Sequence, residues 1–297
     1  MERIVAVIIL SFNEELHIQR AIESVRSIAK DIFVVDSFST DNTTAIAEKL
    51  GAKIVQNKWE GHSRQFNWAL QNLPIQTEWV LRLDADEYLT PELTDEIINK
   101  LPGIEKEVSG IILHRKQYCF GKWFHRLKLL RLFRYNKGFS ERRWMDEHIY
   151  IKDGETVEFD NLFFDHNLNN FGWWTEKHNG YSIREAIDLL DLELNITGKN
   201  TSFVNIGNEA MKKRKKKLLY ARSPLFWRAF VYFFYRYIIK LGFIHGKAGF
   251  IWHFFQGFWY RALVDAKIYE IKKACGNDKG AIIEYIIANY GIDCRNI

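Results

Sequence analysis

The first hundred residues alternate short apolar runs with helix-like segments, and this alternation is the strongest constraint on the fold. Residues 4–10 are continuously apolar, as a strand buried on both faces of a sheet requires. Further strands are expected at 32–35, 53–56 and 79–83, and a helix starts at Thr90–Glu92, where proline takes the first helical position. Strands alternating with helices predict an α/β fold built on a mostly parallel, doubly wound sheet.

Polar side chains follow directly after the ends of these expected strands. Asn13 follows the first, Asp36 the second, and Asp84 and Asp86 come after the run at 79–83. Asn13 is also predicted to cap a helix whose first turn carries acidic residues. Ligands of doubly wound sheets bind at the carboxyl ends of the strands. We therefore expect one binding site to gather these side chains.

The triplet Asp84-Ala85-Asp86 is the most distinctive of these groups. Residues two apart in an extended segment face the same side, so Asp84 and Asp86 can address one divalent cation. Magnesium-like ions often use one or two carboxylates together with substrate phosphates. The alternative is an acidic loop that only caps the following helix, and the triplet alone does not decide between them.

Three segments, in this order, resemble the family 2 glycosyltransferases: Ile9–Glu15, Val34–Asp41 and Leu83–Glu87. The resemblance covers roughly the first hundred residues. It implies a GT-A fold, a nucleoside-diphosphate-sugar donor such as a UDP-sugar, a divalent cation (manganese or magnesium) and inversion at the anomeric carbon. The sequence has Phe12 where tyrosine is common in that family.

The same resemblance assigns roles to individual residues. Glu14 and Asp36 would hold the nucleoside, Asp84 would lie near the ribose and diphosphate, and Asp86 would be the main metal ligand, with Asp84 beside it. Arg64 would bring a basic group to the nucleotide. The residues expected to bind the donor are Ser11, Asn13, Glu14, Asp36, Arg64, Asn67, Asp84, Ala85 and Asp86.

Downstream segments narrow the resemblance to the branch of bacterial lipopolysaccharide-core glucosyltransferases. They are Trp144–His148, Phe164–Asn167, Trp174–Ala186 and Gly242–Phe250. This branch implies transfer of glucose, or a similar hexose, to a heptose of the inner core, and UDP-glucose is the first candidate for the donor. His245 stands where the branch has an acid, so the details of the acceptor stay open. The same fold also serves transfer to polyprenyl phosphate or to a capsule or exopolysaccharide glycan. These acceptors are the alternative to the inner-core heptose.

An inverting transfer needs a base that takes the proton of the acceptor hydroxyl. Asp146 and Glu147 are the candidates, and the position of Glu147 fits the family's downstream carboxylate better. His148 is expected to complete the metal ligands. The alternative is a surface acidic pair bridged to Arg142 or Arg143.

The C-terminal part differs in character from the rest. It opens with the unbroken basic run Lys212–Lys217, and residues 225–261 are dense in aromatic side chains punctuated by Arg and Lys. The segment is either a buried helical core or an interfacial element that lies on an anionic membrane. No apolar stretch reaches the roughly 20 residues of a spanning helix. We expect a GT-A domain at 1–210 and a helical, membrane-associating segment at 211–297.

The cysteines and the N-terminal segment indicate the compartment in which the protein is expected. Cys119, Cys275 and Cys294 lack metal-ligand spacing, which favours a reducing compartment, and the N-terminus does not resemble a signal peptide. We expect a cytoplasmic protein, peripheral on the inner face of the cytoplasmic membrane, with a lipid-linked saccharide as acceptor. The basic run could serve a scaffold or a nucleic-acid binder, but no recognition motif accompanies it, so no nucleic-acid partner is expected.

Overall fold

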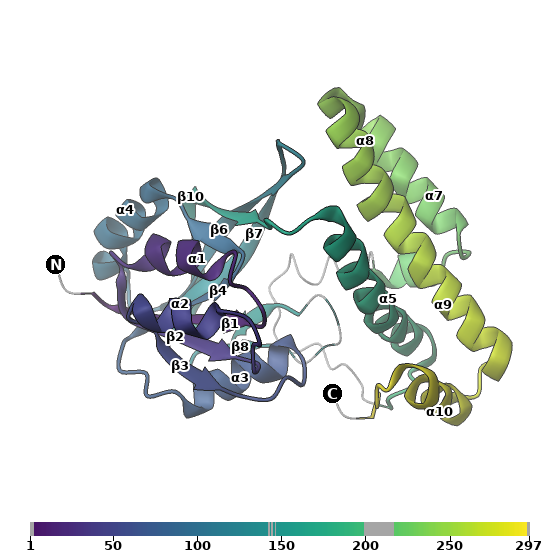
Figure 1. The fold of residues 1–297 in the computed structure, drawn as a ribbon, viewed down its shortest axis with the longest axis horizontal. Helices are drawn as coiled ribbons and strands as arrows, with labels where there is room; N and C mark the ends of the chain where they lie inside the picture. The colour runs from purple at the N-terminus through teal and green to yellow at the C-terminus, as the bar shows by residue number, and fades with distance from the viewer. Residues whose placement is uncertain (1–2, 142, 144, 146, 199–216, 296–297) are drawn as a thin grey trace. The chain divides into compact units, whose positions relative to one another are not determined.

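The computed structural model divides the chain into two compact units (Figure 1). The first unit comprises residues 1–142 and 147–169, and the second comprises residues 143–146 and 170–297. The boundary expected at 210/211 falls outside the described part and stays a prediction. The structure describes all residues except 1–2, 142, 144, 146, 199–216 and 296–297.

An eight-stranded mixed sheet forms the centre of the first unit. Its spatial order is β3 (Lys53–Gln56), β2 (Ala29–Asp36), β1 (Val5–Ser11), β4 (Trp79–Asp84), β7 (Lys122–Arg134), β6 (Val108–Cys119), β10 (Glu155–His166) and β5 (Glu87–Leu89). The four strands from β3 to β4 are parallel, as the alternating pattern predicts, whereas β7 runs antiparallel to both of its neighbours. A separate two-stranded sheet joins β8 (Gly138–Ser140) to β9 (Ile149–Ile151).

Strand β1 is apolar from Val5 to Leu10 because helices cover both faces of the sheet. Val7 and Ile9 belong to a core shared with α1 and α4, while Ala6 and Ile8 pack in a second core with α3. Alternate residues of a strand face opposite sides, so a strand covered on both faces needs no polar position. The helices of this unit are α1 (Ile18–Val25), α2 (Thr43–Lys49), α3 (His62–Asn72) and α4 (Pro91–Lys100).

The expected helix cap at Asn13 is wrong. Asn13 adopts a left-handed φ of 54°, and α1 begins only at Ile18. The side-chain oxygen of Asn13 accepts a hydrogen bond from Thr40 N at 2.8 Å, so it joins two loops and does not cap a helix. Asparagine is among the few residue types that tolerate this backbone conformation.

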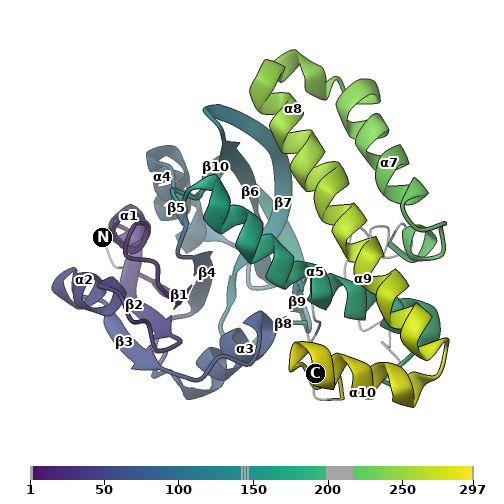
Figure 2. The ribbon, with the colours of Figure 1, turned by 45° about the vertical axis from the view of Figure 1, so that its right-hand side comes forward.

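The second unit is helical (Figure 2). Its elements are α5 (Phe171–Leu194), α7 (Trp227–Phe234), the π-helix η2 (Tyr235–Ile239), the 3₁₀-helix η3 (Gly242–His245), α8 (Gly246–Phe254), the π-helix η4 (Phe255–Trp259), α9 (Tyr260–Cys275) and α10 (Lys279–Tyr290). Its buried core unites α5, α9 and α10 through residues such as Ile187, Ile268 and Ile286. None of the described helices is both long and apolar enough to cross a membrane.

Candidate active site

The register of the parallel strands brings the predicted polar residues to one edge of the sheet. Ser11 lies opposite Asp36 on β2, and Leu10 lies opposite Asp84 on β4. Three neighbouring strands therefore end at the same level with a carboxylate or hydroxyl group. This edge is formed by the carboxyl ends of the strands, where ligands of such sheets bind.

Asp36 is fully buried at this edge and is held by its surroundings. Its carboxylate accepts hydrogen bonds from Ser11 Oγ at 3.1 Å, from Ser39 N at 2.8 Å and from Gln56 Nε2 at 3.5 Å. The Ser39 hydroxyl also donates to it. A buried carboxylate with several donors has a fixed orientation and stays hydrogen-bonded.

The loop after β1 and the loop after β2 are joined by a ladder of hydrogen bonds. Asn13 N donates to Ser39 Oγ at 2.9 Å, and Glu14 N donates to Thr43 Oγ1 at 2.7 Å. The two loops thus form one fixed corner that carries Asn13 and Glu14. Ser39, which is part of this corner, also donates to Asp36.

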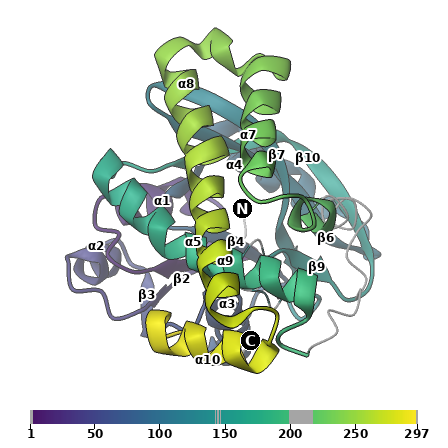
Figure 3. The same ribbon diagram turned by 90° about the vertical axis from the view of Figure 1, so that its right-hand side faces the viewer.

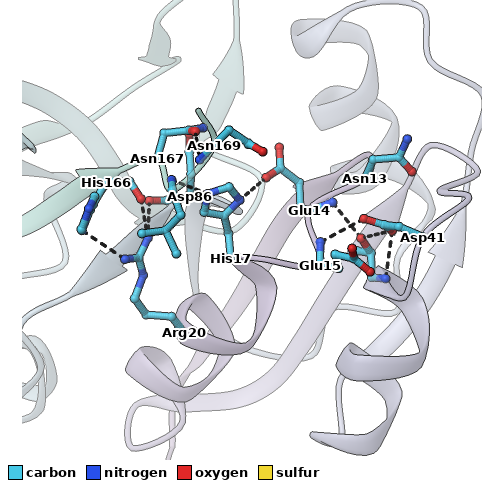
Figure 4. A network of polar contacts seen from close by, with 12 residues as sticks. Asn13, Glu14, Glu15, His17, Arg20, Asp41, Asp86, His166, Asn167 and Asn169 are labelled. Carbon is cyan, nitrogen blue, oxygen red and sulfur yellow. Dashed lines mark hydrogen bonds and ion pairs between the residues drawn. The ribbon is translucent and has the colours of Figure 1, made fainter. Parts of the chain in front are cut away.

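His17 connects Glu14 to the segment that follows β10 (Figure 4). Its ring is fully buried, its Nδ1 lies 2.7 Å from Glu14 Oε2, and its Nε2 accepts from Leu168 N at 2.8 Å. Because Nε2 is an acceptor, Nδ1 carries the proton and donates it to Glu14. His17 therefore orients the Glu14 carboxylate, a role that the sequence analysis did not foresee.

Asp86 is held from the opposite side by the end of β10 (Figure 4). Asn167 Nδ2 donates to Asp86 Oδ2 at 3.1 Å. Arg20 Nη2 donates to the carbonyl oxygens of His166 at 2.5 Å and of Asp86 at 3.4 Å. Burial lowers the pKa of Arg20 from its ordinary value. The Asp86 side chain remains partly exposed, and Arg20 anchors its backbone carbonyl group.

Asp84 lies between two arginines. Arg131 Nη2 is 3.0 Å from Asp84 Oδ2, and Arg82 Nη2 is 3.5 Å from Asp84 Oδ1. Burial alone would raise the pKa of Asp84, but the charges of Arg131 and Arg82 outweigh it and hold the pKa well below its ordinary value. Asp84 is therefore ionised throughout the physiological range.

The acids behind Asp84 are less readily ionised. Burial, followed by the charge of Asp86, raises the pKa of Asp165 to about 7. Burial also raises the pKa of Glu87, which bridges Arg131 at 2.8 Å and Arg115 at 3.3 Å. The edge thus combines an ionised Asp84 with two acids, Asp165 and Glu87, whose pKa values are raised by burial.

Glu147 joins this cluster through Arg82. Glu147 Oε1 lies 3.5 Å from Arg82 Nη2, the same nitrogen that approaches Asp84. The Glu147 side chain is largely buried, at 12% exposure. Asp146 is outside the described residues, so its role stays a prediction. His148 follows Glu147, and its carbonyl oxygen accepts from Glu141 N; its assignment as a metal ligand stays a prediction.

The remaining predicted residues have structural contacts. Asn67 donates to Ser140 O at 2.8 Å and accepts from Ser140 N at 2.9 Å, which ties α3 to β8. Arg64 on α3 pairs at 3.0 Å with Glu60, which precedes that helix. Ala85 is buried between the two aspartates. Whether the first two also contact a nucleotide stays a prediction.

The carboxylates at this edge fit a hard divalent cation. Asp84 Oδ1 is buried and accepts no hydrogen bond, although Arg82 is close. Within the described part of the chain no three His, Cys, Asp or Glu side chains converge on one point. A cation here would therefore rely on Asp84 and Asp86 together with phosphate oxygens, the ligand set that magnesium-like ions accept.

Arginines are the main group of site residues that the sequence analysis missed. Arg82 interrupts the otherwise apolar strand β4, Arg131 interrupts the apolar stretch Leu129–Phe133 of β7, and both arginines are buried. A charged residue inside a buried strand requires a partner. That pattern was readable from the sequence and pointed to acids at the same level of the sheet. The roles of His17, Arg20 and Asn167 depend on loop geometry and had no such signal.

The profile of the family described as glycosyl transferase family 2 matches residues 6–160 of this chain. A Rickettsia conorii protein described as an uncharacterized glycosyltransferase is 31% identical over 265 residues, covering 83% of each chain. A second such protein, from Rickettsia bellii, is 30% identical over 290 residues, covering 91% of this chain and 88% of the relative. The chain belongs to glycosyl transferase family 2.

The Mycobacterium tuberculosis glucosyl-3-phosphoglycerate synthase, in complex with Mn²⁺, UDP and glucosyl-3-phosphoglycerate, is 21% identical with a TM-score of 0.32. That match covers 39% of this chain and 44% of the other. The predicted fold class, an α/β GT-A fold followed by a helical C-terminal region, is confirmed by the sheet topology and the family match.

Proposed function

We propose that this family 2 glycosyltransferase is an inverting hexosyltransferase whose donor is a UDP-sugar, with UDP-glucose as the first candidate. One observation carries the proposal: three adjacent parallel strands end at the same edge and bring Asp36, Asp84 and Asp86 together. Family membership supplies the reaction class, and the edge supplies anchored carboxylates for a nucleoside diphosphate.

The donor would be held by the two ends of this edge. Asp36 and Glu14 lie at the corner between the loops after β1 and β2, where Ser11 and Asn13 fix the geometry. Carboxylates there can accept hydrogen bonds from the base and the ribose. Asp84 and Asp86 would hold a manganese or magnesium ion. Such an ion neutralises the charge that develops on the departing diphosphate.

Glu147 is the proposed base. In the transfer, the acceptor oxygen attacks the anomeric carbon, the bond from that carbon to the UDP oxygen breaks, and the hydroxyl proton passes to the Glu147 carboxylate. Arg82 lies 3.5 Å from both Glu147 and Asp84, so one guanidinium can orient the base relative to the donor-binding carboxylates. Asp146 is the second candidate for the base.

The acceptor in this proposal is a lipid-linked saccharide of the cell envelope, with the inner-core heptose of lipopolysaccharide as the first candidate. The sequence resemblance of Trp144–His148 and Trp174–Ala186 to that branch supports it. The reaction would take place at the inner face of the cytoplasmic membrane. Transfer to polyprenyl phosphate or to a capsule glycan on the same fold is the alternative.

A panel of UDP-, GDP- and dTDP-sugars tests the donor. We expect UDP-glucose to raise the melting temperature only when Mn²⁺ or Mg²⁺ is present, and to be hydrolysed slowly without acceptor. A GDP-sugar that stabilises the protein more than UDP-glucose would contradict the donor assignment. Radiolabelled donor offered to heptose-terminated lipopolysaccharide and to polyprenyl phosphate then separates the two acceptor classes.

A further inference from the structure

The helical hairpin from Phe226 to Phe250 exposes an unusual amount of apolar surface. Twelve of the twenty exposed large hydrophobic side chains among the described residues fall within these 25 positions. We name this set the aromatic face. Its members are Phe226, Trp227, Phe230, Val231, Phe234, Tyr235, Ile238, Ile239, Leu241, Phe243, Ile244 and Phe250.

The exposure is far larger than a soluble surface normally carries. A half-exposed side chain of this size presents on the order of 100 Å². The aromatic face as a whole therefore exceeds the few hundred Å² beyond which an apolar patch marks an interaction site. Trp227 and Ile244 are the most exposed members, at 69% and 66%, and Ile239 is 60% exposed.

Helix α7, which carries part of the aromatic face, is anchored from its inner side. Asp265 on α9 accepts from Phe226 N at 2.7 Å and from Arg228 Nε at 2.8 Å, and it is fully buried. Phe233 packs against Phe254 and Phe258, with ring centroids 6.1 and 6.2 Å apart. Helix α7 runs beside α8 in both side views (Figures 2 and 3).

The turn of the hairpin is closely packed as well. A Cβ on Gly249 would lie 2.3 Å from Gly242 O, and one on Gly242 would lie 2.4 Å from the His253 ring. Only glycine permits such an approach of the two arms. The exposed Phe243 and Ile244 therefore stand on a fixed turn. A helix that is apolar on all sides needs cover on all sides, and here the protein covers only the inner one.

The charges around the aromatic face identify what covers it. From Lys217 to Val264 the sequence has seven Lys or Arg residues and no Asp or Glu. Arg222, Lys240 and Lys247 are exposed within this stretch, and Lys240 Nζ lies 5.7 Å from the Tyr235 ring. If a second copy of the chain covered the aromatic face, the same lysine and arginine side chains of the two copies would lie close together and repel each other. An anionic bilayer surface satisfies both features, because it accepts apolar side chains and attracts cations beside them.

We infer that the aromatic face inserts into the headgroup region of an anionic phospholipid bilayer, with Trp227 and Tyr235 at the interface and Lys240 and Lys247 on lipid phosphates. Binding to a membrane deepens the proposed function. It rests on that function only in one respect, that the acceptor is lipid-linked. The arrangement follows the usual preference of aromatic rings and long cationic side chains for the membrane interface.

Cosedimentation with vesicles tests this inference, without donor or acceptor present. We expect binding to vesicles of phosphatidylcholine and phosphatidylglycerol at about 7:3, much weaker binding to phosphatidylcholine alone, and loss of binding at high salt. The double variant Trp227→Glu/Ile239→Glu should bind at least tenfold more weakly with an unchanged melting temperature. Both side chains are mostly exposed, so the fold should tolerate the change.

Leu127→Glu is the control for an added carboxylate, because it introduces one glutamate at an exposed aliphatic side chain on β7. It should bind vesicles as the wild type does. Wild-type binding by the double variant would overturn the inference, as would equal binding to both vesicle types. A dimer in light scattering that the double variant abolishes would assign the aromatic face to a second copy instead. Failure of UDP-glucose turnover with intact vesicle binding would count against the proposed function alone.

Discussion

The two units place charged and apolar side chains in opposite ways. In the first unit apolar residues fill both faces of the sheet, and the charged groups gather at the strand ends around Asp84. In the second unit charged groups are buried, as in the Arg228–Asp265 pair, while Trp227 and its neighbours are exposed. The first arrangement suits a polar, phosphorylated ligand, and the second suits an apolar interface.

This contrast shows that buried charged side chains have two different roles in one chain. The arginines beside Asp84 hold an acid ionised where we propose that the donor binds. The Arg228–Asp265 pair, with its hydrogen bonds to Tyr220 O and Ala221 O, instead anchors a helix whose apolar side faces outward. The following predictions test the two roles, in order of decreasing effect.

Glu147→Gln should lower kcat by about 10³- to 10⁴-fold, because the amide cannot take the acceptor proton. Binding of UDP should be unchanged, since the amide keeps the shape of the side chain. Steady-state kinetics and titration calorimetry measure the two effects separately. If Glu147→Gln keeps its activity and Asp146→Asn loses it, the base is Asp146.

Asp265→Ala should destabilise the second unit by about 3–5 kcal/mol, because it leaves Arg228 buried without its carboxylate. Urea denaturation measures the change. The control is Glu193→Ala, which removes a partly exposed partner of Lys272 in the same unit and should cost at most about 1 kcal/mol. Equal effects of the two substitutions would show that burial does not separate the two pairs.

The second unit should lose stability in mild acid through His178. Burial lowers the pKa of His178 to about 4, and its ring stacks on Trp174 at 3.6 Å. Between pH 6.5 and 4 the unfolded chain binds a proton that the native state does not, so stability falls as the pH falls, by at most about 3 kcal/mol. Urea midpoints should show a flatter pH profile for His178→Phe. An unchanged profile would contradict the assignment to His178.

Arg82→Lys should reduce kcat about tenfold. Lysine keeps the charge but loses the planar guanidinium that can face Asp84 and Glu147 at once. Arg134→Lys serves as control, because Arg134 donates to Val108 O and Glu105 O on the same sheet, away from these acids. A fall of the same size in the control would assign the effect to the stability of the sheet.

The strands and most helices of the first unit were predictable because their periodicity is strong. Strand β3 and the start of α4 at Pro91 lie where the sequence pattern predicts them. The expected cap at Asn13 was wrong, because an asparagine before a helix can equally take the left-handed conformation and bond to a neighbouring loop. That choice depends on Thr40, which is 27 positions away.

The acids of the site were predictable from their place after apolar strands, but their partners were not. Pairing of Asp84 with Arg131 depends on an antiparallel strand, β7, that enters the sheet beside β4 from a distant part of the chain. For the second unit, composition indicated aromatic and basic helices. Which side of α7 is exposed follows only from the contacts of Asp265 and Phe233.

Titration of UDP into the wild type and Asp86→Ala, each with and without Mn²⁺, tests the central claim most directly. The claim is that the strand-end carboxylates hold a nucleoside diphosphate together with a divalent cation. We predict that Mn²⁺ tightens UDP binding to the wild type at least tenfold and has no effect on Asp86→Ala, while both proteins keep the same melting temperature. Equal enhancement by Mn²⁺ in the two proteins would contradict the account.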